Sequence, residues 1–90
     1  MNIDEIERWV LSADRRLLLM RAIRNSRVVK ASEVARRTDR SIQNISRAIK
    51  ECEELELVEC ITPDKHTWKK YMLTDQGHHV LRELERHKMI

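Results

Sequence analysis

Two short amphipathic segments joined by a few polar residues constrain the fold of this chain more than any other feature. The first segment starts near Ser32 and the second starts at Ser41. Serine accepts hydrogen bonds from the free N–H groups at a helix start, so each serine is expected to cap a helix. Only Thr38, Asp39 and Arg40 separate the two segments. Because this connection is so short and polar, we expect the second helix to cross closely over the first, as in a helix-turn-helix.

The length of the chain limits it to one small domain. Its 90 residues are 41% hydrophobic, which is enough for one modest core and too little for two. A large catalytic cleft is therefore not expected. The chain has no run of about 18 apolar residues and no leader-like start, which predicts a soluble, cytoplasmic protein. Cys52 and Cys60 lack the CxxC spacing and are expected to remain free thiols.

Hydrophobic spacing and helix-capping residues predict the order of the elements. A first helix over residues 1–12 carries Ile3, Ile6 and Val10 at helical spacing. Ser12 is expected to cap a strongly apolar second helix over residues 13–24, and Val28 and Val29 favour a very short strand. The helix-turn-helix covers residues 32–55. Residues 57–62 and 68–73 are strand candidates that form a hairpin, and Thr74 caps a last helix over residues 75–90.

These elements predict a mainly α fold with a small β-hairpin (α+β). The expected architecture is a winged helix-turn-helix, with a three-helix core, a β-wing over residues 57–73, and additional N- and C-terminal helices. All 90 residues are expected to form one domain.

The distribution of charge is more informative than the net charge of +3. Residues 26–50 carry seven basic and two acidic side chains, whereas residues 51–62 carry five acidic side chains and no basic one. Residues 63–74 are basic again, with three lysines against one aspartate. Since binding to nucleic acid depends on where positive charge is concentrated, two basic zones around an acidic one favour a polyanionic partner.

The second helix of the pair has the side chains of a DNA-reading helix. A helical wheel places Ile45, Ile49 and Cys52 on one side, while Gln43, Arg47 and Lys50 lie opposite. Arginine can donate to guanine and amide side chains can pair with adenine in the major groove. The N-terminal part of such a helix enters the groove, so the candidate base-reading residues are Ser41, Gln43, Asn44, Ser46 and Arg47.

The alternative is an ordinary solvated helix face, which would also be polar. The order of charges along the helix argues against it. Arg40, Arg47 and Lys50 precede the glutamates of residues 51–56, the reverse of the order that the helix dipole favours. A polyanion at the N-terminal end, repelled by the acidic far end, would explain this order and would orient docking.

The predicted hairpin carries positive charge suited to DNA backbone or minor-groove contact. Lys65, His66 and Thr67 lie at its tip, and Lys69 and Lys70 follow. An alternative is that these charges only protect an exposed sheet edge. The complete set of candidate phosphate and wing contacts is Arg40, Lys50, Lys65, His66, Lys69 and Lys70.

Residues 41–58, the basic hairpin after them, and the sequence Y-M-L-T-D-Q-G together resemble winged helix-turn-helix transcriptional regulators of the MarR and ArsR types. The resemblance covers roughly residues 13–85. It implies that the segment from Ser41 to Lys50 is the recognition helix, that the hairpin is the wing, and that Leu73, Thr74 and Gly77 form the L-T-x-x-G motif opening the last helix.

The sequence departs from these relatives at three positions. Asp39 and Glu56 replace glycines that are common there, so these residues are strained if their φ angles are positive. Ile42 occupies a position that is often polar in the family. It could touch a thymine methyl group, but we expect it to pack inward.

These observations predict a sequence-specific regulator that binds double-stranded DNA as a homodimer. One domain of this size contacts a short site, and two-fold dimers read half-sites about one helical turn apart. The apolar faces of the terminal helices are the expected interface, although they could instead complete the core of the monomer. The interface candidates are Ile3, Ile6, Trp9, Val10, Val80 and Leu84.

Other functions are less well supported by the sequence. No nucleophile–base pair or glycine-rich phosphate loop is present, so an enzyme is not expected. His79, Glu83 and His87 have ligand spacing on the last helix, but the neighbouring arginines oppose a cation, and no metal or cofactor is expected. The main alternative is a winged-helix interaction or assembly module that uses the acidic segment 51–59. A metal- or ligand-responsive repressor is a third possibility.

Overall fold

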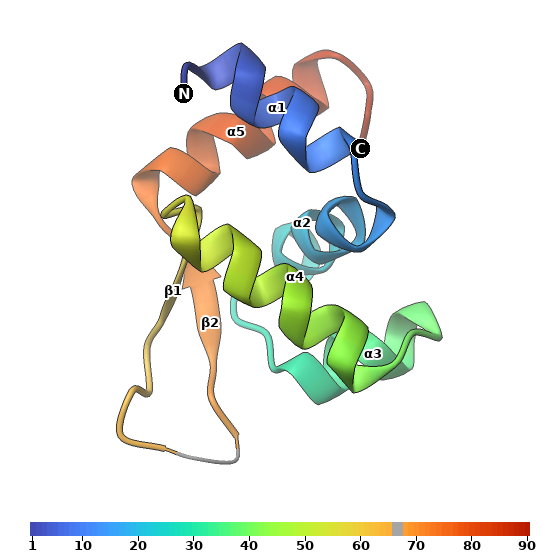
Figure 1. The fold of residues 1–90 in the computed structure, drawn as a ribbon, viewed down its shortest axis with the longest axis vertical. Coiled ribbons are helices and arrows are strands. Elements are labelled where there is room, and N and C mark those ends of the chain that lie inside the picture. The colour runs from blue at the N-terminus through green and yellow to red at the C-terminus, as the bar shows by residue number, and fades with distance from the viewer. Residues whose placement is uncertain (66–67) are drawn as a thin grey trace.

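The computed structural model describes residues 1–65 and 68–90, which form a helical core with a two-stranded antiparallel sheet (Figure 1). The winged-helix architecture predicted from the sequence is confirmed. In chain order they are α1 (Ile3–Leu11), α2 (Asp14–Ser26), α3 (Ala31–Thr38), α4 (Ile42–Glu54), β1 (Val58–Cys60), β2 (Tyr71–Leu73) and α5 (Asp75–Arg86). Within the described ranges, no helix is both long and apolar enough to cross a membrane.

The core lies between α2 and α4, and it extends to the contact between α1 and α5. Leu19 and Met20 of α2 are fully buried against the apolar side of α4, which supplies Ile45 and Ile49. Cys52 lies in the same core, and its burial raises the pKa of its thiol to about 12. Cys52 and the half-buried Cys60 are free thiols within the described residues. Because a protonated thiol is a poor nucleophile, Cys52 acts as a core residue.

The apolar faces of the two terminal helices complete this core. Ile6 and Val10 of α1 and Val80 and Leu84 of α5 have exposures of 3% or less. Figure 1 shows α1 and α5 side by side at one end of the molecule. We expected these four residues at a dimer interface, but they are buried within the monomer. This is the alternative given in the sequence analysis, in which the terminal helices complete the monomer core. Ile3 and Trp9 remain partly exposed.

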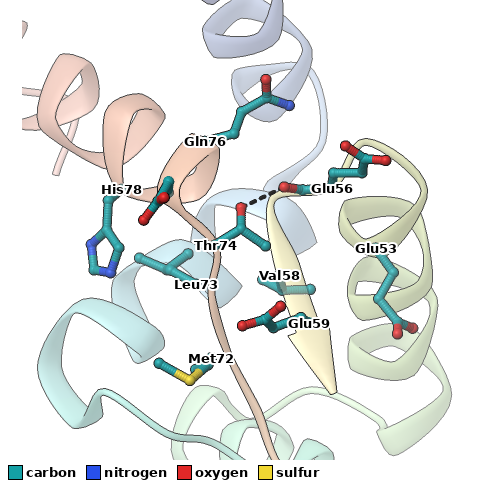
Figure 2. Close-up of a pocket in the computed structure, with 10 residues that line it drawn as sticks. Glu53, Glu56, Val58, Glu59, Met72, Leu73, Thr74, Gln76 and His78 are labelled. Atoms are coloured by element: carbon teal, nitrogen blue, oxygen red, sulfur yellow. Dashed lines mark hydrogen bonds between the residues drawn. The ribbon is translucent and has the colours of Figure 1, made fainter. Parts of the chain in front are cut away.

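Two of the four predicted helix caps are confirmed. The side chain of Ser41 accepts a hydrogen bond from Asn44 N at 3.0 Å, and that of Thr74 accepts one from Gly77 N at 3.0 Å. Thr74 also donates its hydroxyl hydrogen to the backbone carbonyl of Glu56 (Figure 2). This contact ties the start of α5 to the turn after α4.

The caps predicted at Ser12 and Ser32 are wrong. Ser12 ends α1, where its hydroxyl donates to Trp9 O at 2.7 Å, and Ala13 occupies the N-cap position of α2. Lys30 precedes α3, so Ser32 already lies inside its first turn. In both cases the N-cap position falls on a residue whose side chain has no hydrogen-bond acceptor.

Both turns flagged in the sequence have positive φ angles. Asp39 ends α3 with φ 56° and ψ 40°, and Glu56 follows α4 with φ 58°. Aspartate tolerates the left-handed region better than most residues, whereas glutamate has no such advantage. Both turns therefore adopt the left-handed backbone conformation that glycine favours, without a glycine.

The hairpin is shorter in regular structure than predicted. β1 and β2 pair in the register Val58 with Leu73, Glu59 with Met72, and Cys60 with Tyr71. Val29 forms an isolated bridge to Tyr71, with backbone N···O distances of 3.0 and 2.9 Å, so the very short strand expected at Val28 and Val29 is reduced to a single paired residue. The bridge fixes β2 to the segment before α3, so the hairpin starts beside the helix-turn-helix (Figure 1).

Candidate nucleic-acid interface

The outer face of α4 is exposed and polar in its N-terminal half. At about 100° per residue, the exposed side chains of the helix cover an arc of roughly 140°. Gln43, Ser46 and Lys50 lie near the centre of this arc, while Arg47 lies at its α2 side with 71% of its side chain exposed. These are donors and acceptors of the kind that read base edges in a major groove.

Two of the candidate base-reading residues have other roles. Ser41 is exposed, but its hydroxyl caps α4. Asn44 is half-buried, and its Oδ1 atom is buried without a hydrogen-bond partner among the described residues. The structure therefore brings Gln43, Ser46 and Arg47 together on the open face and turns Asn44 partly toward the protein.

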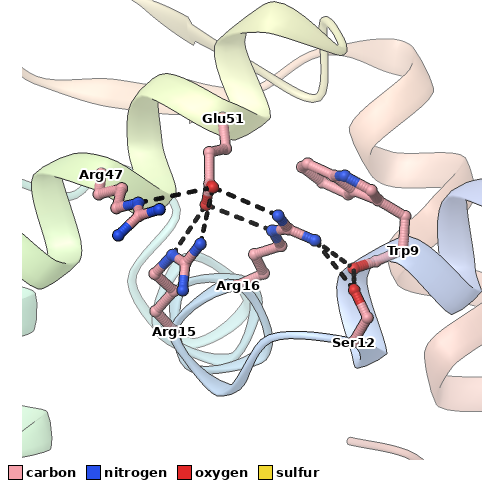
Figure 3. A network of polar contacts seen from close by, with 6 residues as sticks. All are labelled: Trp9, Ser12, Arg15, Arg16, Arg47 and Glu51. Carbon is pink, nitrogen blue, oxygen red and sulfur yellow. Dashed lines mark hydrogen bonds and ion pairs between the residues drawn. The ribbon is translucent and has the colours of Figure 1, made fainter.

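A carboxylate on the side of α4 holds the helix to α2 (Figure 3). Arg15 donates from Nε and Nη2 to the two oxygens of Glu51, at 2.8 and 2.7 Å. Arg16 makes a second pair of hydrogen bonds to the same carboxylate, at 3.3 and 3.2 Å. These hydrogen bonds, those of Arg15 first, lower the pKa of Glu51 from 4.5 to about 2. The first glutamate of the acidic segment is therefore a tertiary anchor, which the sequence reasoning missed.

Arg16 extends this contact to α1. Its Nη1 atom donates to Trp9 O at 2.8 Å and to Ser12 Oγ at 3.0 Å. Its guanidinium carbon also lies 3.9 Å from the centroid of the Trp9 ring, which is a cation–π contact. Glu51, Arg16 and Trp9 thus connect three helices behind the exposed face of α4 (Figure 3). We define these residues with Arg15 as the Glu51 cluster.

Most of the candidate phosphate contacts are exposed. Lys50 of α4 and Lys65, Lys69 and Lys70 of the hairpin all lie at the surface. Arg40 is also exposed but forms an ion pair with Asp14 at the start of α2. His66 lies outside the described residues, as does Thr67.

A groove connects the recognition-helix candidate with the hairpin. It has a volume of about 330 Å³ and lies between the start of α3, the start of α4 and the strand side of the hairpin. We call it the helix–wing groove; its lining residues are Lys30, Ala31, Ser32, Ile42, Ser46, Trp68, Lys69 and Tyr71.

Ile42 lies in this groove and is 53% exposed, so the expectation that it packs inward is wrong. Ile42 is the first residue of α4, where the helix opens onto the groove between the start of α3 and the hairpin.

Three glutamates of the acidic segment, Glu53, Glu56 and Glu59, line a different groove. This groove has a volume of about 640 Å³ and borders the start of α5. Figure 2 shows two of its lining residues, Glu53 of α4 and Glu59 of β1. Glu56 and Asp75 add further negative charge, and Met72 contributes an apolar wall. We call this space the acidic groove. Arg47 and Lys50 on the exposed face of α4 are therefore separated from the negative charge in this groove.

His87, the residue that follows α5, contacts α1. His87 Nδ1 lies 2.8 Å from Glu7 Oε2, and Glu7 is only 6% exposed. His79 and Glu83 line a shallow groove of about 440 Å³ with Ile3, Arg82 and Arg86. Within residues 1–65 and 68–90, no three histidine, cysteine or acidic side chains gather as metal ligands would.

Comparison with known proteins places the chain in a structural context. The family model described as HVO_A0114 matches residues 10–78. The structure is similar to that of the AntR antimony-specific transcriptional repressor, with a TM-score of 0.78 and 21% identity over 93% of this chain and 72% of that one. No match was found among curated proteins.

A second similar structure is that of a MarR-family transcription regulator, with a TM-score of 0.77 and 20% identity. The match covers 96% of this chain, which spans 60% of the length of that protein. At this level of identity, the similarity establishes the fold: the five helices and hairpin form a winged helix of the kind found in transcription regulators.

Proposed function

Because the chain belongs to the HVO_A0114 family and has the winged-helix fold of transcription regulators, we propose that it regulates transcription by binding specific sites in double-stranded DNA as a homodimer. The observation that supports this proposal most is the exposed face of α4. Gln43, Ser46 and Arg47 lie on this face, beside an exposed hairpin that carries lysines. Helix α4 enters the major groove, and the hairpin contacts the backbone or the adjacent minor groove.

The side chains divide into base readers and phosphate contacts. Gln43 and Arg47 offer the hydrogen-bond geometry that distinguishes base pairs, with Ser46 between them. Lys50, Lys65, Lys69 and Lys70 supply charge to phosphates, which contributes affinity with little sequence preference. The Glu51 cluster supports this function by fixing α4, because a recognition helix that moves cannot hold a base-specific register.

Dimerisation would use the outer surface of the terminal helices. The buried faces of α1 and α5 are occupied within the chain, so the remaining candidates are partly exposed residues at their junction. The groove lined by Ile3, His79, Arg82, Glu83 and Arg86 is a suitable contact region because it mixes an apolar side chain with charges of both signs. Two copies would then read two half-sites on one face of the duplex.

The proposal is tested with DNA fragments selected by the protein from a random pool. Fluorescence anisotropy on a selected duplex measures affinity, and the molar ratio at saturation measures how many copies bind. Arg47→Ala should reduce discrimination against substituted base pairs, at a cost of about 1 to 3 kcal/mol at the contacted position. Lys69→Ala should instead weaken binding to all duplexes similarly and reduce the slope of log affinity against log salt by about one.

If both variants weakened every duplex to the same extent, the division into readers and phosphate contacts would be wrong. Wild-type affinity should also fall by orders of magnitude between about 50 and 200 mM salt.

The acidic groove favours one alternative function, a winged-helix module for protein interaction or assembly. Glu53, Glu56 and Glu59 would there face a basic partner. Such a module would not retain DNA even at low salt, so the same titration separates the two functions.

A further inference from the structure

Ile42 is a large apolar side chain exposed among polar groups. Its neighbours in the helix–wing groove include Lys30 and Ser32 at the start of α3, Ser46 on the next turn of α4, and Lys69 on the hairpin. Keeping such a side chain in water gives up the favourable transfer free energy of its apolar surface. Ile42 lies on the proposed binding face beside lysines. We therefore expect the ligand of this groove to carry negative charge and also to present an apolar group to Ile42.

The position of Ile42 on α4 restricts where that ligand must lie. On the helical wheel, Ile42 is at the hairpin side of the exposed arc and Arg47 is at the opposite side. Ser46 is about 40° from Ile42, so both side chains border the same groove. With α4 in a major groove and the hairpin in the adjacent minor groove, the DNA strand between the two grooves passes through the helix–wing groove.

The chemistry of the groove fits this strand. Lys30 and Lys69 lie on two different sides of it and match phosphate charge, while Trp68, which is 59% exposed, forms an apolar wall on the hairpin. In the major groove, the apolar projection from a base edge is the C5-methyl group of thymine. An exposed isoleucine at the N-terminal turn of α4 can contact that methyl group.

We propose that Ile42 is a specificity-determining residue that reads the methyl group of a thymine in each half-site. The inference rests on the proposed DNA-binding function and adds a base preference that Gln43 and Arg47 do not supply. The occupant of the groove is one DNA strand, with its thymine methyl against Ile42 and its phosphates near the two lysines.

Replacing thymine by deoxyuracil removes only this methyl group and leaves base pairing unchanged. Each thymine of a selected duplex is replaced in turn, and binding of wild-type protein and Ile42→Ala is measured by anisotropy. Wild-type affinity should fall about threefold to fivefold at one or two positions per half-site, the effect expected for one buried methyl group. Ile42→Ala should bind the thymine and deoxyuracil duplexes equally.

Two further variants give matched controls. Ile42→Val keeps a branched side chain and should retain most of the thymine preference. Leu11→Ala removes an exposed aliphatic side chain at the end of α1, outside the residues lining the groove, and should leave the preference unchanged. Circular dichroism checks that each variant is folded.

Equal wild-type binding to thymine and deoxyuracil at every position would overturn the inference, although the duplex binding itself would still support the proposed function. Full deoxyuracil sensitivity in Ile42→Ala would also overturn it, because another residue would then contact the methyl group. Absence of duplex binding by folded wild-type protein at low salt would overturn the proposed function and this inference together.

Discussion

The only glycine of the chain is needed for close approach between α5 and the start of β1. A Cβ atom at Gly77 would lie 2.0 Å from the carbonyl oxygen of Leu57 and 2.9 Å from Leu73 Cδ2. The same Leu57 carbonyl accepts a hydrogen bond from Thr74 N at 3.0 Å. The L-T-x-x-G motif thus has a packing explanation: leucine enters the core, threonine caps α5, and glycine lets the helix touch the backbone.

Gly77→Ala should therefore destabilise the protein, although alanine favours a helix by about 1 kcal/mol over glycine. The overlap with a backbone carbonyl must be relieved by moving α5, at an expected net cost of about 2 kcal/mol or more. Denaturant unfolding measures this cost. His78→Ala, at the next and exposed position, should change stability by less than about 0.5 kcal/mol. A Gly77→Ala variant as stable as wild type would contradict the explanation.

Residue-level predictions succeeded where local chemistry decides the outcome. Ser41 and Thr74 cap helices because each combines an acceptor side chain with a following apolar helix. Ser32 has the same chemistry but lies inside α3, because the bridge between Val29 and Tyr71 fixes where the preceding segment turns. Ile42 was expected to pack inward, yet at the first position of α4 it lies in the helix–wing groove with 53% of its surface exposed.

At the scale of elements, the Glu51 cluster determines how α4 is held. The helix caps and apolar spacing of α4 were visible in the sequence, but the partners of Glu51 lie 35 and 36 residues away on α2. No local pattern identifies which glutamate of an acidic segment meets them. The interpretation that these glutamates serve only to repel DNA is therefore incomplete, since one of them anchors the proposed recognition helix.

The low pKa of Glu51 predicts how this anchor depends on pH. Its pKa is lowered from 4.5 to about 2 in the folded protein, so the cluster stabilises the fold fully above pH 4.5 and loses this contribution as the pH falls toward 2. Glu51→Gln should cost on the order of 1 to 2 kcal/mol at pH 7.

The difference in unfolding free energy between wild type and Glu51→Gln should shrink as the pH falls from 4.5 to 2. Glu53→Gln replaces an exposed acid on the same helix and is the control, because little change is expected at pH 7. If the wild-type and Glu51→Gln curves stayed parallel throughout this range, the ionised carboxylate would not be the source of the stabilisation.

At the scale of the whole molecule, the order of the elements and the winged-helix architecture could be predicted, whereas the contact between the terminal helices could not. An apolar helix face indicates that something covers it, without indicating whether the cover belongs to the same chain. Here α5 covers α1, and the pair of Glu7 and His87 joins residues 80 positions apart. The apolar faces that were expected to form a dimer interface are therefore part of the monomer core.

The order of charges along α4, with Arg47 and Lys50 before the glutamate Glu54 at its C-terminal end, predicts a long-range effect on DNA binding. Glu54 lies at the end of α4, about 18 Å along the axis from Ile42, and is exposed. Its charge should repel DNA at 10 mM salt, where the screening length is about 30 Å, but hardly at 150 mM, where it is about 8 Å. Glu54→Gln should therefore raise DNA affinity about twofold at the lower salt concentration and leave it unchanged at the higher one. Anisotropy titrations at both concentrations measure this; an equal gain at both would mean that Glu54 contacts DNA directly, and loss of affinity would contradict the proposed orientation of α4.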